Sequence, residues 1–90
     1  MHFEWDEQKH RINIHKHGLS FADAGAIFAA PMLAALDDRE DYGEDRYVII
    51  GMVDNRLLYV AYAMRDETIR IISARGAEPY ERRQYHEDNG

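Results

Sequence analysis

The sequence contains no cysteine, and proline occurs only twice in its 90 residues. Without cysteine there is neither a disulfide nor a thiolate metal site, which fits a protein that is not exported. No apolar run approaches the length of about 18 residues that a membrane-spanning helix needs. The start of the chain, Met1 to Asp6, also lacks the basic and apolar regions of a signal peptide. We therefore expect a cytoplasmic protein that makes no contact with a membrane.

An excess of positive charge is also missing, because the formal net charge is −6. Such a balance argues against non-specific binding to nucleic acid. The acidity is concentrated in residues 37–45, which hold six acidic residues and one arginine, so the remaining chain is nearly neutral. A solvated loop is the simplest interpretation of this segment, and docking of a basic protein partner is an alternative. A calcium loop is disfavoured because the EF-hand spacing is absent.

The first half of the chain is predicted to be mainly helical. With 46% hydrophobic residues the protein can bury one core. A short strand at residues 3–5 precedes Asp6, a suitable helix N-cap, and Gly18 can end that helix just after His17. Ser20 predicts the start of a second helix. Its apolar residues, spaced by three and four, should face the core: Phe21, Ala24, Ile27 and Phe28.

The second half is predicted to be mainly strands, once Pro31 has ended the helical half. Four β-prone runs follow, the first of them weak: residues 32–36, 46–53, 57–64 and 68–75. The connections between the last three runs are short, so these strands should pair antiparallel. Pro79 opens a short last helix that should fray from His86 onward. The expected fold is α+β, with two N-terminal helices and a short C-terminal helix on one face of a small antiparallel sheet.

Two arginines interrupt the most β-prone run of the second half, Arg70 inside it and Arg75 at its end. Strict alternation of side chains places them on opposite faces of the strand. Arginine has five donors and no acceptor, so each should bind a carboxylate or a phosphate. Internal ion pairs are one interpretation, and a phosphate site on a small sheet is the other. Arg46, which begins an earlier strand, is expected to pair with Glu44 across the turn.

Basic residues on the first helix are a second group of candidates. Histidine at a helix C-terminus, as at His17, is favoured by the helix dipole. Lysine near a helix N-terminus is mildly unfavourable, so the position of Lys9 hints at a purpose. A zinc site formed by His10, His15 and His17 is disfavoured, because the three do not converge on one face of a helix.

The last helix carries a third group. Arg82 and Tyr85 are three residues apart and should be neighbours on one helical face. This pair suits an RNA strand, whose phosphate can bind the guanidinium and whose base can stack on the ring. The alternative is that Glu78 and Glu81 neutralise the nearby arginines within the helix.

Several motifs follow one another along the whole chain. In the first half they are Phe3-Glu4-Trp5-Asp6, Lys9, Asn13, Lys16-His17-Gly18, Phe21, Ala24, Phe28 and Pro31. In the second half they are Glu44, Arg46, Gly51, Ile69-Arg70-Ile71-Ile72-Ser73-Ala74-Arg75, Glu81-Arg82 and Tyr85. In this order and separation, the motifs resemble those of the BrnT family of toxins.

The resemblance implies a single BrnT-like toxin domain over residues 1–90 with a RelE-like fold. It further implies a ribonuclease toxin of a type II toxin-antitoxin system, which cuts RNA without a metal or other cofactor and inhibits translation. The implied partner is a BrnA-type antitoxin, usually a ribbon-helix-helix protein, through which alone the toxin would meet DNA. The alternative is a catalytically weak or inactive module that holds this antitoxin and acts as a co-repressor.

Candidate site residues follow from the resemblance and from the chemistry of RNA cleavage. Attack of the 2′-OH on phosphorus needs a base, an acid and cations around the phosphorane. The catalytic candidates are His17, Arg70, Arg75 and Tyr85, and the RNA-binding candidates are Lys9, Arg46 and Arg82. Imidazole exchanges protons near neutral pH, so His17 is the expected proton carrier. Arg70 and Arg75 are expected to clamp the phosphate in one shared cationic pocket, and Tyr85 to stack on a base or donate a proton.

Overall fold

The structure is a computed structural model that describes residues 2–29, 33–37, 41 and 43–89. Five strands form one sheet: β1 His2–Glu4, β2 Leu33–Asp37, β3 Arg46–Val53, β4 Arg56–Arg65 and β5 Thr68–Gly76. The helices are α1 Glu7–His17, α2 Phe21–Ala24 and α3 Pro79–Asn89, and a 3₁₀ helix, η1, covers Gly25–Ala29. None of these helices is both long enough and apolar enough to cross a bilayer. The predicted helix stop at Pro31 lies outside the described residues, as do two residues of the acidic segment, Asp38 and Glu40.

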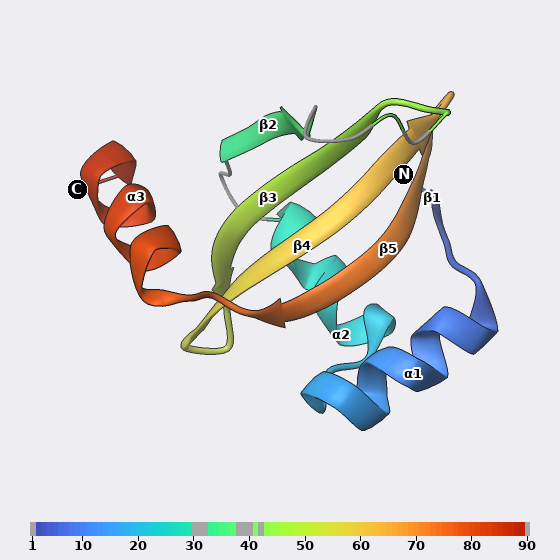
Figure 1. Cartoon of the computed structure of the whole chain (residues 1–90), viewed down its shortest axis with the longest axis horizontal. Coiled ribbons are helices and arrows are strands. Elements are labelled where there is room, and N and C mark those ends of the chain that lie inside the picture. Colours follow the sequence, from blue (N-terminus) through green and yellow to red (C-terminus); the bar gives the residue numbers. More distant parts are fainter. Residues whose placement is uncertain (1, 30–32, 38–40, 42, 90) are drawn as a thin grey trace.

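The sheet is mixed, with the strand order β1-β5-β4-β3-β2 (Figure 1). Strands β2 to β5 pair antiparallel, but β1 pairs parallel with β5. The α+β class is therefore confirmed, and the prediction of a purely antiparallel sheet is wrong. The cause lies in the connection: β1 reaches β5 through the rest of the domain, so no hairpin dictates its direction.

Local caps define α1 as the sequence predicts. The side chain of Asp6 accepts a hydrogen bond from the N–H of Lys9 at 3.1 Å. At the other end Gly18 has φ 69° and donates its N–H to the carbonyl of Ile14 at 2.8 Å. The cap at Ser20 is also present, with its hydroxyl accepting from the N–H of Asp23 at 3.0 Å.

The second N-terminal helix is shorter than predicted. Helix α2 has one turn, and the chain tightens into η1 at Gly25. Glycine is a poor helix former, and short 3₁₀ stretches are common where an α-helix ends. The apolar face is nevertheless placed as expected, since Phe21, Ala24 and Ile27 are buried and Phe28 packs against the same core.

The core lies between these helices and one face of the sheet. Besides the helical residues it contains Ile49, Leu58, Val60, Tyr62, Ile69, Ile71 and Ala74. Gly51 allows η1 to approach β3 closely, because a Cβ there would lie 2.8 Å from Cγ1 of Ile27. Positive φ angles at Asp54 and Asn55, 49° and 65°, make a tight turn between β3 and β4, in agreement with the short connection expected there.

A β-bulge changes which side chains share a face. Between the pairs Ala61–Ser73 and Tyr62–Ile71, β5 has one extra residue, Ile72. Beyond the bulge the alternation is shifted by one position. Arg70 pairs with Ala63 and Arg75 with Tyr59, and these two β4 residues lie on the same face. The prediction that Arg70 and Arg75 lie on opposite faces is therefore wrong, because a single extra residue resets the period.

Helix α3 lies beyond one end of the sheet, away from α1 and α2 (Figure 1). Its side chains line a groove with Ile50 and Tyr59, which belong to the face opposite the core. The prediction that every helix covers one face is thus wrong, because Arg75 and Glu81 draw α3 to the opposite face. The helix extends to Asn89, and the expected fraying from His86 stays a prediction.

Candidate functional site

Helix α1 and the edge of β5 enclose a small recess of about 180 Å³, which we call the α1–β5 notch. It is lined by Lys9, Ile12, Asn13, Lys16, His17, Ile72 and Ser73. The α1 residues repeat at spacings of three, four and seven, so one face of the helix supplies them. The β5 residues come from the bulge. The structure thus brings together Lys9 and His17, two of the residues predicted from sequence.

Asn13 holds the floor of this notch in place. Its side chain is buried, and its Nδ2 donates to the carbonyls of Leu19 and Ala74, both at 2.9 Å. Its Oδ1 accepts from the N–H of Ala74 at 3.1 Å. The side chain therefore imitates a neighbouring strand at Ala74, where β1 no longer covers the edge of β5. These bonds fix the position of α1 relative to Ser73.

The face of the sheet opposite the core carries a line of charged residues, here called the charged row. It consists of Glu4, Arg70, Arg46 and Asp37, each from a different strand and in register through Ala63. Glu44 lies beside it, with Oε1 4.0 Å from Nε of Arg46 and 4.0 Å from Nη1 of Arg70. The expected pair of Arg46 with Glu44 is therefore confirmed, and the same carboxylate also approaches Arg70.

Arg75 is held in a separate and tighter arrangement. Its Nη1 and Nη2 donate to the two carboxylate oxygens of Glu81 at 2.7 and 2.8 Å. Oε1 of Glu81 also accepts from the N–H of Glu78 at 2.8 Å, which caps the start of α3. The guanidinium carbon of Arg75 lies 4.1 Å from the centre of the Tyr59 ring. Arg75 therefore fastens α3 to the sheet.

Electrostatics reinforce this pair. Burial works against the charged form of Glu81, but the hydrogen bonds from Arg75 and from Glu78 outweigh it, so the pKa of Glu81 lies below its ordinary value of 4.5. The hydrogen bond to Glu81 likewise raises the pKa of Arg75 above its ordinary range, against the effect of burial. Both groups are therefore charged at neutral pH.

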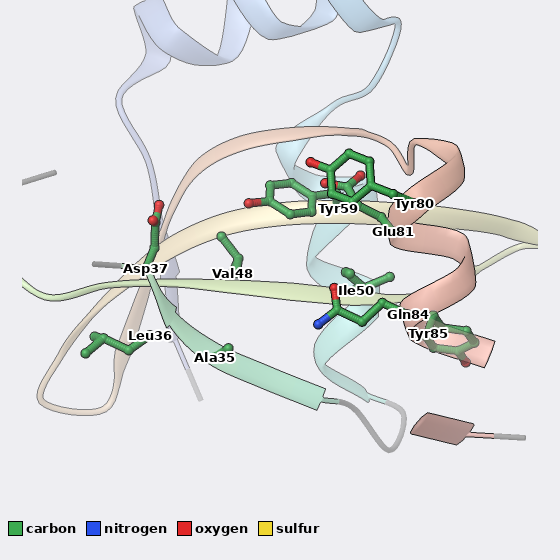
Figure 2. Close-up of a pocket in the computed structure, with 10 residues that line it drawn as sticks. All are labelled: Ala35, Leu36, Asp37, Val48, Ile50, Tyr59, Tyr80, Glu81, Gln84 and Tyr85. Atoms are coloured by element: carbon green, nitrogen blue, oxygen red, sulfur yellow. The ribbon is translucent and has the colours of Figure 1, made fainter. Parts of the chain in front are cut away.

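A groove of about 290 Å³ lies between β2, β3 and α3 (Figure 2). It is lined by Ala35, Leu36, Asp37, Val48, Ile50, Tyr59, Tyr80, Glu81, Gln84 and Tyr85. Figure 2 shows Tyr59, Tyr80 and Glu81 gathered near the start of α3, with Asp37 at the far end on β2. The predicted residue Tyr85 thus lies in a largely apolar groove that neither Arg70 nor Arg75 lines.

The expected site therefore separates into three places. Lys9 and His17 share the notch, Arg46 and Arg70 share the charged row, and Tyr85 lines the groove. Arg70 and Arg75 lie on one face, but their partners on β4 are four residues apart, which corresponds to about 13 Å along the strand. Arg82 is exposed on α3. Among the described residues, no group of three or more histidines and carboxylates is arranged to hold a metal.

Sequence reasoning did not predict that Lys16 and Asn13 would lie in this notch. Lys16 is one of the notch residues, and its spacing of seven from Lys9 was a usable signal, since residues two helical turns apart share a face. The buried position of Asn13 had no comparable signal, because α1 is polar on nearly all sides and its orientation is set by packing against β5.

Comparison with known proteins identifies the family of this chain. A search of curated proteins finds no match. A family model described as "Ribonuclease toxin, BrnT, of type II toxin-antitoxin system" matches residues 5–81. This span includes every residue of the notch and both arginines of the charged row, and it ends just before Arg82 and Tyr85. The chain therefore belongs to the BrnT family of ribonuclease toxins of type II toxin-antitoxin systems.

Proposed function

We propose that this chain is an endoribonuclease that cuts RNA by attack of the 2′-OH without the help of a metal, and thereby inhibits translation. The observation that carries the proposal is the family match over residues 5–81. The geometry supports it, because Lys9 and His17 line one recess beside Ser73. A cation, a proton carrier and a hydroxyl donor are thus available to one phosphate group.

In the proposed reaction the 2′-oxygen attacks the adjacent phosphorus and the 5′-oxygen leaves. One group takes the proton of the 2′-OH, another protonates the leaving oxygen, and cations stabilise the phosphorane between them. His17 is the proton carrier, since histidine is the side chain that most often serves as a general acid or base. Lys9 supplies positive charge in the same recess. Arg82 and Tyr85, on the outer part of α3, extend the RNA-binding surface.

Arg46 and Arg70 bind the RNA backbone on the open face of the sheet. The side chain of Arg70 is 36% exposed, and its Nη1 lies 4.0 Å from Oε1 of Glu44, so the two form a weak ion pair. Such partly exposed pairs contribute at most about 1 kcal/mol, so a phosphate can replace the carboxylate at small cost. Arg75 is different, because a catalytic role for it requires release from Glu81. Of the two predicted clamps, Arg70 is therefore the stronger candidate.

The test is cleavage of a short RNA by the purified protein in the presence of EDTA, with the products analysed for 2′,3′-cyclic phosphate ends. His17→Gln should lower the cleavage rate about 100-fold or more, because general acid–base catalysis contributes at least that factor. His15→Gln is the matched control, since His15 is exposed on the same helix and lies outside the notch. Equal cleavage by wild type and His17→Gln across pH 6 to 9 would exclude His17 as the proton carrier.

A BrnA-type antitoxin of the ribbon-helix-helix class is the proposed partner. It would cover the sheet face that carries Arg46, Arg70 and Arg75 and meet these arginines with acidic side chains. Inducible expression of the toxin alone should arrest growth, and co-expression of the protein encoded by the neighbouring gene should restore it. Growth arrest that the neighbouring protein does not relieve would contradict this partner assignment.

A second candidate function is a binding module that holds the antitoxin and acts as its co-repressor with little catalysis of its own. The ion pairs favour it, because Arg46, Arg70 and Arg75 each have a carboxylate oxygen within 4.0 Å. The net charge of −6 also opposes RNA binding. Measured RNA affinity separates the two functions: an RNase should lose affinity as salt rises, whereas a scaffold should show almost no salt-dependent RNA binding.

A further inference from the structure

Nearby carboxylates balance the positive side chains in the charged row, but not those in the α1–β5 notch. The two arginines of the charged row lie among three carboxylates, those of Glu4 and Asp37 in the row and that of Glu44 beside it. In the α1–β5 notch the lining includes two lysines and a histidine but no acidic residue. Within the described part of the chain, no carboxylate oxygen lies within 4.0 Å of a side-chain nitrogen of Lys9, Lys16 or His17. The notch is therefore a concentrated cationic site on an acidic protein.

The walls of the notch suit a small anion. Ile12 and Ile72 supply the apolar part of the lining, and Ile12 is 57% exposed, so an anion can reach the recess directly from solvent. Ser73 adds a hydroxyl that can donate a hydrogen bond. Lys9 and Lys16 are seven residues apart on α1, about 10 Å along the axis, and their long flexible stems can bring both ammonium groups to one anion between them.

The helix dipole explains only part of this arrangement. Lys16 and His17 lie in the last turn of α1, where positive charge is favourable. Lys9 lies in the first turn, where its charge opposes the positive end of the dipole. Helix stability therefore does not account for Lys9, whereas completion of an anion site does.

We infer that the α1–β5 notch binds a phosphate group of a nucleic acid strand, through the ammonium groups of Lys9 and Lys16 and the hydroxyl of Ser73. The assignment of RNA as the natural source of this phosphate rests on the proposed function. The notch then places the phosphate beside His17, and the arginines of the charged row bind the strand elsewhere. Lys16 becomes a ligand-binding residue for which the catalytic proposal alone has no use, and Ser73 gains a defined role as a hydrogen-bond donor to the bound phosphate.

The first experiment titrates the intact ¹⁵N-labelled protein with inorganic phosphate, against sodium chloride of equal ionic strength. Saturable shifts of the amide signals of Lys16, His17 and Ser73 are expected. Lys16→Gln should abolish saturation. Arg11→Gln, which removes a positive charge from an 80% exposed side chain of the same helix, should retain it. Saturable shifts confined to Arg46 and Arg70, or none at the notch, would overturn the inference.

The second experiment measures the affinity for a single-stranded oligonucleotide made only of 2′-deoxynucleotides, which cannot undergo 2′-OH attack, as a function of salt. Loss of one phosphate-binding lysine should reduce the slope of log affinity against log salt by about 0.7. This reduction is expected for Lys9→Gln and for Lys16→Gln, with no change for Arg11→Gln. A Lys16→Gln slope equal to that of Arg11→Gln would refute the role of Lys16.

The two proposals fail in different ways. RNA cleavage by the wild-type protein with no saturable phosphate binding at the notch would overturn this inference and leave the ribonuclease function intact. Saturable phosphate binding at the notch in a protein that cleaves no RNA would support the anion site and overturn the catalytic proposal. Phosphate binding without oligonucleotide binding would identify the notch as a site for the free anion and refute its role toward a nucleic acid strand.

Discussion

Replacement of Glu81 by glutamine should destabilise the fold by about 2–3 kcal/mol. The Glu81 side chain is only 2% exposed, and its two oxygens accept three hydrogen bonds, two from Arg75 and one from the N–H of Glu78. Glutamine has nearly the same shape but places an NH₂ donor where a second acceptor is needed. Removing one partner of a fully buried ion pair costs about 3–5 kcal/mol. The Arg75 side chain is 26% exposed, so water should recover part of that loss.

Urea denaturation followed by circular dichroism measures this change, provided that the m-value stays constant. Glu78→Gln is the matched control, because Glu78 is 57% exposed and its oxygen lies 4.0 Å from Arg75. Such a pair should contribute less than about 0.5 kcal/mol. The free energy of unfolding of Glu81→Gln could instead lie within about 0.5 kcal/mol of the wild-type value, which is the scale of a surface ion pair. That result would refute the idea that Arg75 and Glu81 anchor α3.

The result also decides how Arg75 variants are interpreted. If the pair anchors α3, Arg75→Ala leaves a buried carboxylate at Glu81 and weakens the fold. Loss of toxicity in Arg75→Ala would then report stability as well as chemistry. Arg70→Ala lacks this complication, since the ion pair of Arg70 is long and partly exposed. Toxicity of Arg70 variants is therefore the clearer measure of RNA contact.

Three further predictions concern stability. Asn13→Ala should cost about 2–3 kcal/mol in urea denaturation, because it leaves the buried N–H and C=O of Ala74 without their partner; a loss below 0.5 kcal/mol, the scale of surface substitutions, would contradict the strand-like role of Asn13. Gly51→Ala should cost about 1–3 kcal/mol, because its new Cβ would meet Ile27 at 2.8 Å; an unchanged unfolding midpoint would show that η1 shifts freely. Stability should also fall in acid: the pKa of Glu81 is lower in the folded than in the unfolded chain, so the unfolded state binds more protons below pH 4.5. The contribution of Glu81 is complete above that pH and is lost as the pH falls through the folded pKa, and Glu81→Gln should flatten this part of a stability–pH curve.

Features controlled by neighbouring residues were predictable from sequence. The caps at Asp6 and Ser20, the glycine at the end of α1 and the turn at Asp54 each depend on the chemistry of a few adjacent positions. The three long strands were predicted almost to the residue for the same reason. Lys9 and His17 were also recognised as candidates, since their types and helical position are visible in the sequence.

Features controlled by distant contacts were not predictable. The parallel pairing of β1 with β5 joins the two ends of the domain, and no local pattern encodes it. The bulge at Ile72 depends on how β5 fits against β4, yet it decides the face on which Arg75 lies. The side chosen by α3 depends on the pair of Arg75 with Glu81 across the connection between β5 and α3. These contacts between distant residues account for the differences between the predicted and the observed site better than any error in the predicted helices and strands.

The charge distribution explains how so acidic a chain can belong to a family that acts on RNA. Arginines that are equivalent in the sequence are held differently: Arg75 is fixed by two short bonds to Glu81, whereas Arg70 has a long contact to Glu44 that a phosphate can replace. The notch adds Lys9 and Lys16, which need no such exchange. Under the proposed function, RNA binding should depend on a few directed contacts and not on a general positive field. Two to four such contacts correspond to a salt slope of about −1.4 to −2.8 for a single strand. A much steeper slope would require additional phosphate-binding residues beyond the notch and the charged row.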